Sequence, residues 1–407
     1  MSDARTFVVI GASLAGATAA ETLRLEGFEG RVVLVGEESL RPYQRPPLSK
    51  DYLRGKVGDE KVFLHDEGFY DDQNIELRLS TPVRAVDVQS REVVFDSGER
   101  VGYDAALVAT GAAPRRLSVP GSDLPGVHYL RNLEDADLLR EAIQNGGRVV
   151  VIGGGWIGCE VAASARQLGA EVALVEVGQY PLQRVLGEEL GRFYRDVHAE
   201  QGIELHLGVA VESLRGGATV GEVCLSDGES LSADVVVVGV GVAPRVELAE
   251  AAGLVLDNGI VTDEHLATSV PGVFAAGDVS SAWHPVLGRH IRLEHWSSAL
   301  NQGPVAAQNM LGVPTPYTRI PYFFSDQYEI GMEYTGQGND SDEIVFRGDP
   351  DSREFIAFWL RGGRVAAGMN VNVWDVAESI AALIAAGSPV DAALLAEPDV
   401  DLASLAE

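Results

Sequence analysis

The chain has 407 residues, enough for two or three domains that each bury their own core. Its 46% hydrophobic and 22% charged residues are typical of a globular protein and exclude a disordered one. The net charge of −29 argues against binding to nucleic acid or to an anionic membrane. No stretch approaches the ~18 apolar residues that cross a bilayer, and the N-terminal apolar run is too short for a signal peptide. We therefore expect a cytoplasmic protein.

The N-terminal region carries the first motif. Residues 6–11 form a predicted buried strand, followed by Gly-Ala-Ser-Leu-Ala-Gly (11–16) and a helix to about Leu25. A second strand, Arg31–Gly36, ends in Glu37. This order begins a doubly wound fold, in which the helix N-terminus binds a pyrophosphate. The middle glycine of the usual pattern is replaced by serine, so the strict pattern is broken in this copy.

The same order recurs about 140 residues later, and in this second copy all three glycines of the pattern are present. A strand over Arg148–Ile152 leads into Gly-Gly-Gly-Trp-Ile-Gly (153–158), a helix over Cys159–Leu168 and a strand over Glu171–Val175 that ends in Glu176. In each copy the acid follows the first glycine at roughly the 20 residues expected of a ribose-binding carboxylate. Two such motifs in this context predict two dinucleotide-binding units.

The acid of the second motif also indicates which nicotinamide cofactor binds. The Glu176 carboxylate would repel a 2′-phosphate, and the next residues, Val-Gly-Gln (177–179), contain no arginine to receive one. Arg184 follows only a few residues later. We expect NADH in preference to NADPH.

The remaining strands indicate that the second unit is inserted into the first. Val235–Gly239 closes the second unit, Gly241–Pro244 crosses back, and Val273–Asp278 supplies a further strand of the first unit. We predict an α/β protein with two Rossmann-like domains and a C-terminal α+β domain. The first domain takes residues 1–113 and 244–316, the inserted domain 114–243, and the C-terminal domain 317–407.

The C-terminal domain is predicted from a change in pattern. Glu343–Arg347, Glu354–Leu360 and Val365–Asn370 alternate like strands of an antiparallel meander, with a hairpin at Gly362-Gly363. A helix near Val376–Ala386 follows. This domain carries no nucleotide-binding signature of its own.

Further segments carry a resemblance along the whole chain. The most specific is Arg-Pro-Pro-Leu-Ser-Lys (45–50), which ends the run from Arg41 to Lys50. The others are Ala-Thr-Gly (109–111), Tyr-Leu-Arg (129–131), Ala-Ala-Gly-Asp (275–278), Glu-His-Trp (294–296) and Tyr-Phe-Phe-Ser-Asp-Gln-Tyr (322–328). With them the chain resembles the FAD-containing ferredoxin reductases that serve bacterial Rieske oxygenases and haem-thiolate monooxygenases, within the glutathione-reductase-like superfamily. The resemblance implies FAD in the first domain and NADH in the inserted one.

Carried over position by position, the resemblance implies the residues that hold each cofactor. Cations would face the pyrophosphate, Asp278 would hold the ribityl chain, and Trp296 would lie near the flavin ring. The implied FAD residues are Gly11, Ser13, Leu14, Ala15, Gly16, Glu37, Arg45, Lys50, Val83, Ala109, Thr110, Gly111, Arg131, Gly277, Asp278 and Trp296. The implied NAD residues are Gly153, Gly155, Ile157, Gly158, Glu176 and Gly241.

Lys50 and Glu160 are the implied catalytic pair. In similar enzymes the corresponding lysine and glutamate form an ion pair beside flavin N5, where the lysine favours the anionic reduced flavin. A purely structural salt bridge is the alternative. No general acid–base step is expected, because hydride passes directly from nicotinamide to flavin.

The cysteines indicate where electrons cannot go. Cys159 and Cys224 are too few for a disulfide framework or a metal cluster, so no metal site is expected. Disulfide reductases of the superfamily carry a C-x-x-x-x-C pair in the first helix after the ribose-binding acid, and single-cysteine peroxidases and oxidases keep one cysteine there. This chain has Arg-Pro-Pro-Leu-Ser-Lys in that region. Electrons must therefore leave the flavin for an external acceptor.

The resemblance implies an NADH-dependent ferredoxin reductase that passes single electrons to a small iron–sulfur ferredoxin of an oxygenase or monooxygenase. A rubredoxin reductase and an NADH oxidase or diaphorase remain alternatives. An alternative of another class is a non-enzymatic redox-sensing flavoprotein similar to apoptosis-inducing factor. That alternative expects a basic surface or a long targeting segment, and the acidity of the chain argues against it.

A local cationic cluster marks a predicted docking face for the acceptor. Arg289, His290, Arg292 and Arg319 make up this cluster in an otherwise acidic chain. Relatives often carry Trp-Phe-Trp-Ser-Asp-Gln where this chain begins with Tyr-Phe-Phe (322–324), so the aromatic character is kept without the indoles. We expect a monomer or homodimer, with neither nucleic acid nor a membrane as partner.

Overall fold

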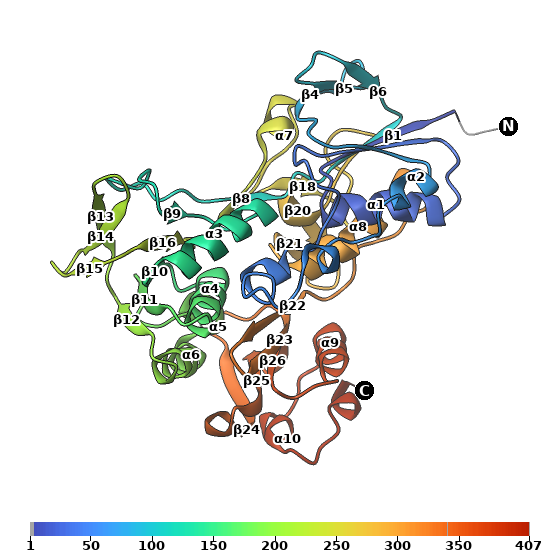
Figure 1. Ribbon diagram of the computed structural model, residues 1–407. Coiled ribbons are helices and arrows are strands. Elements are labelled where there is room, and N and C mark those ends of the chain that lie inside the picture. Colours follow the sequence, from blue (N-terminus) through green and yellow to red (C-terminus); the bar gives the residue numbers. More distant parts are fainter. Residues whose placement is uncertain (1–3, 340, 407) are drawn as a thin grey trace. The chain divides into compact units, whose positions relative to one another are not determined.

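The computed structural model describes residues 4–339 and 341–406, which form two compact units (Figure 1). Unit 1 takes residues up to Gln44, then 59–113 and 243–321. Unit 2 takes 45–58, 114–242 and the residues from Tyr322 onward. Residues 45–58 were assigned from the sequence to the first domain but belong to unit 2, which also contains the C-terminal segment. The division into three domains stays a prediction.

Unit 1 is built on a five-stranded parallel sheet in the order β19-β7-β1-β2-β3. Its strands are β1 (Thr6–Ile10), β2 (Arg31–Val35), β3 (Ile75–Arg78), β7 (Ala105–Val108) and β19 (Val273–Ala275). The residues of the three central strands are almost all buried, as expected of a parallel sheet covered on both faces. Strand β1 lies between β2 and β7, so the turn after β1 is at a topological switch point.

Two long helices and several small elements complete unit 1. Helix α1 (Leu14–Leu25) begins directly after the glycine-rich turn, and α8 (Trp296–Met310) packs closely on it through Gly303. The other elements are α2 (Phe69–Asp72), α7 (Glu247–Ala251), the antiparallel strands β4 (Val83–Asp87), β5 (Glu92–Phe95) and β6 (Arg100–Gly102), and the sheet of β18 (Ile260–Thr262), β20 (Ser280–His284) and β21 (Arg289–Ile291). The sequence pattern did not predict α8.

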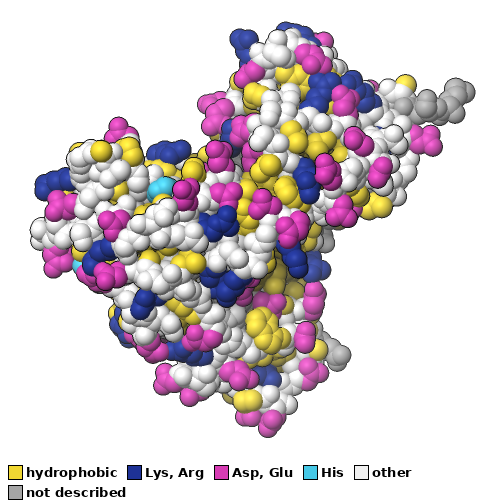
Figure 2. All heavy atoms as spheres, viewed as in Figure 1, with side chains coloured by type: hydrophobic (Ala, Val, Ile, Leu, Met, Phe, Trp, Pro, Cys, Tyr) yellow, Lys and Arg dark blue, Asp and Glu magenta, His cyan; other side chains and the backbone are white. Residues whose placement is uncertain are grey.

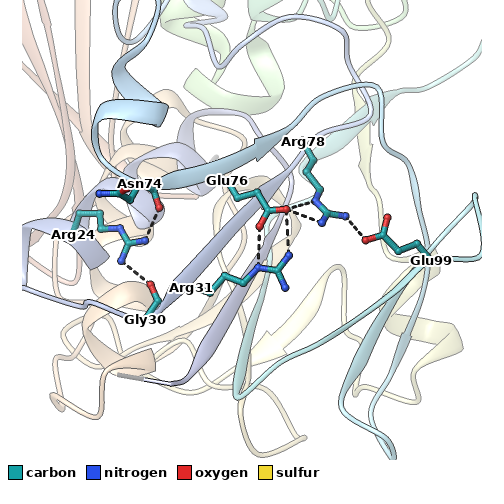
Figure 3. Close-up of polar contacts among 7 residues, drawn as sticks. All are labelled: Arg24, Gly30, Arg31, Asn74, Glu76, Arg78 and Glu99. Atoms are coloured by element: carbon teal, nitrogen blue, oxygen red, sulfur yellow. Dashed lines mark hydrogen bonds and ion pairs between the residues drawn. The ribbon is translucent and has the colours of Figure 1, made fainter. Parts of the chain in front are cut away.

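Charged side chains tie the β2–β3 edge of this sheet to its surroundings (Figure 3). Glu76 on β3 accepts hydrogen bonds from Arg31 on β2, at 2.8 Å to Nε, and from Arg78 on its own strand. Arg78 also donates to Glu99 at 2.8 Å. The pKa of Glu76 is lowered, above all by the hydrogen bond from Arg31, so this edge is held by an ionised carboxylate.

Unit 2 repeats the same construction in its first part. The parallel sheet has the order β12-β11-β10-β16-β9, with the glycine-rich turn after its central strand. Its strands are β9 (Val127–His128), β10 (Arg148–Ile152), β11 (Glu171–Glu176), β12 (Glu204–Leu207) and β16 (Val235–Val238). Its helices are α3 (Leu133–Asn145), α4 (Trp156–Gln167), α5 (Gln183–Leu186) and α6 (Glu188–Glu200). Helix α4 begins three residues earlier than predicted, because the glycine turn itself ends at Gly155.

The remaining strands of this part lie outside the parallel sheet. The strands β13 (Val211–Gly216), β14 (Val220–Leu225) and β15 (Ser230–Ser232) form an antiparallel sheet, and β8 (Ala112–Pro114) pairs with β17 (Val242–Pro244). The chain passes from one unit to the other within β8 and returns within β17.

The C-terminal part of unit 2 is an antiparallel sheet in the order β22-β23-β26-β25-β24. Its elements are β22 (Tyr322–Gln327), β23 (Ile330–Gly336), β24 (Glu343–Asp349), β25 (Glu354–Arg361), β26 (Arg364–Val371), α9 (Ala377–Ala386) and α10 (Ala392–Ala396). The last three strands and α9 confirm the predicted meander and helix. Trp156 of α4 packs edge-on against Phe323 of β22, with ring centroids 4.8 Å apart, so this sheet shares a core with the parallel one.

Within the described residues, no helix is long and apolar enough to cross a membrane.

Candidate cofactor-binding and electron-transfer sites

The glycine-rich turn of unit 1 has the geometry of a phosphate-binding turn. Gly11 has a φ of 118°, which a residue with a side chain rarely adopts. A Cβ on Gly16 would lie 1.9 Å from the Gly11 carbonyl oxygen, so only glycine lets α1 start this close to β1. Ser13 has extended backbone and makes no capping hydrogen bond with its side chain. Helix α1 therefore begins directly at this turn, and a helix N-terminus suits a pyrophosphate.

The predicted ribose-binding acid of unit 1 has a charged partner that was not predicted from the sequence. Glu37 accepts hydrogen bonds from Arg245, one at 2.9 Å from Nη2 to Oε2 and the other from Nη1. The backbone carbonyl of Arg245 in turn accepts a hydrogen bond from the Thr110 hydroxyl at 2.8 Å. A carboxylate has about four acceptor sites, so a ribose hydroxyl can still bind to Glu37. Arg245 follows the predicted crossover directly, but nothing in the sequence linked it to Glu37.

A second group of predicted FAD residues gathers at the N-terminus of α8. The Gly277 N–H donates to Gln302 Oε1 at 2.8 Å, and a Cβ on Gly277 would lie 3.1 Å from the Cβ of Ala15. Burial lowers the pKa of His295 to about 4, and the nearby Asp278 carboxylate opposes this shift. Ala15, Gly277, Asp278 and the α8 N-terminus at Trp296 therefore lie in one region of unit 1. An acid in such a region suits the hydroxyls of a ribityl chain.

The other predicted FAD residues are divided between the units. Leu14 is the buried first residue of α1, Val83 begins β4, and Ala109 lies against Gly11, all in unit 1. Arg45, Lys50 and Arg131 belong to unit 2. There Arg45 Nη1 donates to the carbonyl oxygen of Arg131 at 2.5 Å.

The glycine-rich turn of unit 2 repeats the geometry with its full glycine pattern. Gly153 has a φ of 105°, and a Cβ on Gly158 would lie 1.9 Å from the Gly153 carbonyl oxygen. A Cβ on Gly155 would meet nothing within 4 Å, so protein packing does not explain this glycine. The space above Gly155 fits the close approach of a pyrophosphate.

Glu176 is held beside this turn by backbone amides. It accepts from the Gly154 N–H at 2.5 Å and from the Gly178 N–H at 2.7 Å. Exposed apolar side chains surround the turn, namely Ile157 at 45%, Val177 at 67% and Val240 at 37% exposure. Apolar groups around a few polar ones are typical of a cofactor site. These contacts fit an adenosine whose ribose lies at Glu176.

The lysine–glutamate pair is buried within unit 2. Lys50 Nζ lies 3.0 Å from Glu160 Oε2, and the two residues are only 7% and 4% exposed. Lys50 follows a short 3-10 helix over Pro46–Ser49, and Glu160 lies on α4. Two serines for which no role was predicted also bind the carboxylate. Ser49 donates to Oε2 and Ser325 to Oε1, the latter at 2.7 Å.

The two cysteines are buried and lie in separate elements of unit 2. Cys159 is fully buried in α4, and this burial raises the pKa of its thiol. Cys224 is 7% exposed in β14. Among the residues that the structure describes, no cluster of three or more His, Cys, Asp or Glu could hold a metal ion.

Comparison with family models matches nearly the whole chain. Residues 5–303 match the model described as pyridine nucleotide-disulphide oxidoreductase. Residues 322–406 match the model described as reductase C-terminal.

Similar proteins span the full length of the chain. The ferredoxin–NAD(+) reductase component of an anthranilate 1,2-dioxygenase system from Burkholderia cepacia is 40% identical over 401 residues, which cover 98% of this chain and 99% of that protein. Rhodocoxin reductase from Rhodococcus erythropolis is 37% identical, with 98% and 93% covered. Among solved structures, the covalent putidaredoxin reductase–putidaredoxin complex matches with a TM-score of 0.95 at 37% identity, covering 98% of each chain.

Proposed function

The chain belongs to the pyridine nucleotide-disulphide oxidoreductase family, and we propose that it is an NADH-dependent ferredoxin reductase of an oxygenase system. The family implies FAD and NAD(H) as cofactors. Similar proteins are named as ferredoxin–NAD(+) reductase components, and one solved relative is covalently joined to its ferredoxin partner.

The observation that carries this function is the lack of a reactive cysteine pair where a disulfide reductase needs one. A disulfide reductase of this fold needs a reactive cysteine pair after its first ribose-binding acid, where this chain has Arg-Pro-Pro-Leu-Ser-Lys (45–50). Burial raises the pKa of Cys159 and removes it from thiolate chemistry. Since the chain offers no thiol relay, its electrons go to another molecule.

Each of the two glycine-rich turns would bind the pyrophosphate of one cofactor. The turn from Gly11 to Gly16 would bind the FAD pyrophosphate, with Asp278 at the ribityl hydroxyls. The turn from Gly153 to Gly158 would bind the NADH pyrophosphate, with Glu176 at the adenosine ribose, where its charge disfavours a 2′-phosphate. When bound, FAD supplies the conversion of a two-electron hydride into single electrons. The buried Lys50 would place one positive charge that favours the reduced cofactor, and Glu160 would hold that charge in position.

The acceptor would dock on a cationic part of unit 1. Arg289 and His290 are exposed on β21, whose residue Arg289 pairs in register with His284. The His284 ring binds the carbonyl oxygen of Arg319 at 3.0 Å, which brings exposed Arg319 to the same hairpin. Arg292, which was predicted to belong to the docking face, is left out of the proposed patch. Its side chain is only 10% exposed and pairs with Glu294 at 2.6 Å. The docking patch is therefore Arg289, His290 and Arg319.

These cations stand in an acidic protein. On the face drawn in Figure 2, acidic side chains are spread widely, with lysines and arginines interspersed among them. With a net charge of −29, a small acidic ferredoxin would be repelled at long range and guided only by a local cationic patch.

The function is tested with the purified yellow protein in stopped-flow experiments. We expect rapid bleaching of the flavin by NADH and slower bleaching by NADPH, followed by reduction of a [2Fe–2S] ferredoxin. A [3Fe–4S] ferredoxin and rubredoxin serve as competing acceptors, because one relative is named a rubredoxin–NAD(+) reductase. Bleaching without transfer to any protein acceptor would contradict a reductase of this kind and support a redox-sensing flavoprotein.

The docking patch is tested by charge reversal. In Arg289→Glu and Arg319→Glu we expect the second-order rate constant for ferredoxin reduction to fall at least tenfold at low salt, with unchanged reduction of ferricyanide by NADH. The matched control is Arg192→Glu, an exposed arginine on α6 of unit 2. An equal loss of both activities would show that the patch does not dock the acceptor.

A further inference from the structure

A line of buried polar side chains in unit 2 begins at Glu160 and leads away from Lys50. Ser325 Oγ lies 2.7 Å from Glu160 Oε1, and Gln327 Nε2 lies 3.2 Å from that hydroxyl. His198 Nε2 lies 3.0 Å from Gln327 Oε1, and its Nδ1 lies 3.2 Å from the Tyr328 hydroxyl. Ser325, Gln327 and His198 are between 0% and 2% exposed. Buried polar groups of this kind are costly unless each is paired.

The chemistry of the groups fixes the direction of every hydrogen bond. An ionised Glu160 can only accept, so Ser325 must donate its single proton to it and accept from the Gln327 amide. The Gln327 oxygen therefore accepts from His198, whose Nε2 must carry a proton. Burial lowers the pKa of His198 to about 4, so the ring is neutral at pH 7 and its Nδ1 accepts from Tyr328. All donors thus point toward the Glu160 carboxylate.

The far end of this line is held firmly in place. Tyr328 lies in the turn between β22 and β23 with a φ of 59°, which is unusual for a bulky residue. Its ring packs edge-on against His198, with centroids 5.6 Å apart, besides the hydrogen bond to Nδ1. Arg353 donates both to Glu329 in the same turn and to Glu200 at the end of α6. These contacts fasten α6 to the turn that carries Gln327 and Tyr328.

We propose that Ser325, Gln327 and His198 are positioning residues for the Lys50–Glu160 pair, in which a directed line of donors holds the Glu160 carboxylate with its Oε2 turned to Lys50. The proposal rests on the proposed function, because the pair acts on hydride transfer only if NADH reduces the flavin. It assigns a role in that step to α6 and to the C-terminal sheet, which hold no residue of the predicted cofactor sites.

Other titratable groups also act on Glu160. Lys50 is its direct partner in an ion pair. The thiol of Cys159 on α4 and the hydroxyl of Tyr194 on α6 interact with it electrostatically. Burial raises the pKa of both Cys159 and Tyr194, so neither titrates on the acid side of neutrality. Desolvation also raises the pKa of Asp326, which interacts with both members of the pair. Asp326 is therefore the neighbouring carboxyl group whose own titration must be separated from the effect on the Lys50–Glu160 pair.

The first measurement is the pH profile of flavin reduction by NADH in single turnovers. Ser325→Ala removes the donor next to Glu160, and we expect the acid limb of the profile to move up by about one pH unit. His198→Leu should move it in the same direction by less, and His198→Gln should restore it because an amide N–H can replace Nε2–H. The shift should persist in an Asp326→Asn background.

The control is His206→Gln, which changes an imidazole on β12 that pairs with Glu204 and Glu229 instead. Its acid limb should match that of the wild type. An unchanged acid limb in Ser325→Ala, in a wild type that NADH reduces, would overturn the positioning role. A wild type that NADH does not reduce would instead overturn the proposed function.

A second measurement does not depend on turnover. Nitrogen-15 NMR of the imidazoles should show His198 as the neutral Nε2–H tautomer at pH 7, and Gln327→Leu should weaken or abolish that state. An Nδ1–H tautomer in the wild type would make Nε2 an acceptor, reverse the direction of the line and overturn the proposal.

Discussion

The glycine-rich turns of the two units are nearly the same in backbone and differ in how each acid is held. Gly11 and Gly153 have φ values of 118° and 105°, and in both turns a Cβ on the last glycine would lie 1.9 Å from the first carbonyl oxygen. The acid of unit 1 is paired with the guanidinium of Arg245. Glu176 of unit 2 is bound by two backbone N–H groups.

The similar backbone of the two turns serves pyrophosphate binding, which both proposed cofactors require. The different partners of the two acids bear on selectivity between cofactors. The close approach of helix and strand is required in both turns, because any dinucleotide brings a pyrophosphate. A carboxylate beside a cation belongs to a pair with little net charge, whereas a carboxylate bound by neutral amides keeps a net negative charge that would repel a phosphate. If NADH binds to unit 2 as proposed, the charge of Glu176 would therefore disfavour a 2′-phosphate there.

The largest expected effect comes from adding one methyl group to the last glycine of each turn. Gly16→Ala and Gly158→Ala place a Cβ within 1.9 Å of a carbonyl oxygen, and such overpacking costs about 1–3 kcal/mol or more. We expect Gly16→Ala to lose FAD, measured as flavin absorbance per chain after gel filtration. Gly158→Ala should keep FAD but lose reduction by NADH. Loss of FAD from both variants would show that the turns do not act independently.

The next effect tests the selectivity of Glu176. Glu176→Gln removes the charge that would face the ribose in the proposed complex, and we expect the ratio of kcat/KM for NADH to that for NADPH to fall at least tenfold, about 1.4 kcal/mol. Steady-state reduction of ferricyanide with each donor measures the ratio. Glu37→Gln is the matched variant in unit 1 and should leave the ratio unchanged. A similar change in both variants would contradict the assignment of the cofactors to the units.

A smaller effect concerns the sheet edge of unit 1. The lowered pKa of Glu76 means that its contribution to stability is present above its usual value of about 4.3 and is lost as the pH falls through the folded value. The pair is partly exposed, so the contribution is at most about 1 kcal/mol. Glu76→Gln should lower Tm at pH 7 and leave it little changed at pH 3 in calorimetry. Glu171→Gln, at the sheet of unit 2, should have no effect, because this exposed acid lies 3.9 Å from Arg148.

The smallest effect tests the broken motif. Ser13 and Gly155 occupy the same place in the two turns, and both have extended backbone with negative φ. Serine therefore causes no strain, and Ser13→Gly should change FAD affinity by less than about 1 kcal/mol. Titration of the apoprotein with FAD measures the affinity. A large gain in Ser13→Gly would show that the serine side chain obstructs the pyrophosphate.

The elements that could be predicted from the sequence are those with a regular local pattern of apolar residues and turn residues. The buried strands, the two glycine turns and the last three strands and helix of the C-terminal sheet follow from hydrophobic period and turn chemistry. Strand β22 was not predicted as a strand, because Tyr-Phe-Phe-Ser-Asp-Gln (322–327) shows no simple alternation of residue type. Strand β23 was missed although its apolar residues do alternate, at Ile330, Met332 and Tyr334. Helix α8 was missed because Pro304 and small residues mask its period.

The sequence by itself determined the two dinucleotide motifs and the lack of a cysteine pair, because these depend on local spacing and composition. Lys50 and Glu160 became candidates only through the resemblance to a known family. Only the tertiary structure decided that Arg245 meets Glu37, that Arg292 is paired with Glu294, and that a directed line of donors runs from His198 to Glu160. Such contacts join residues more than 100 positions apart, or depend on how a side chain is turned. No local pattern in the chain records them.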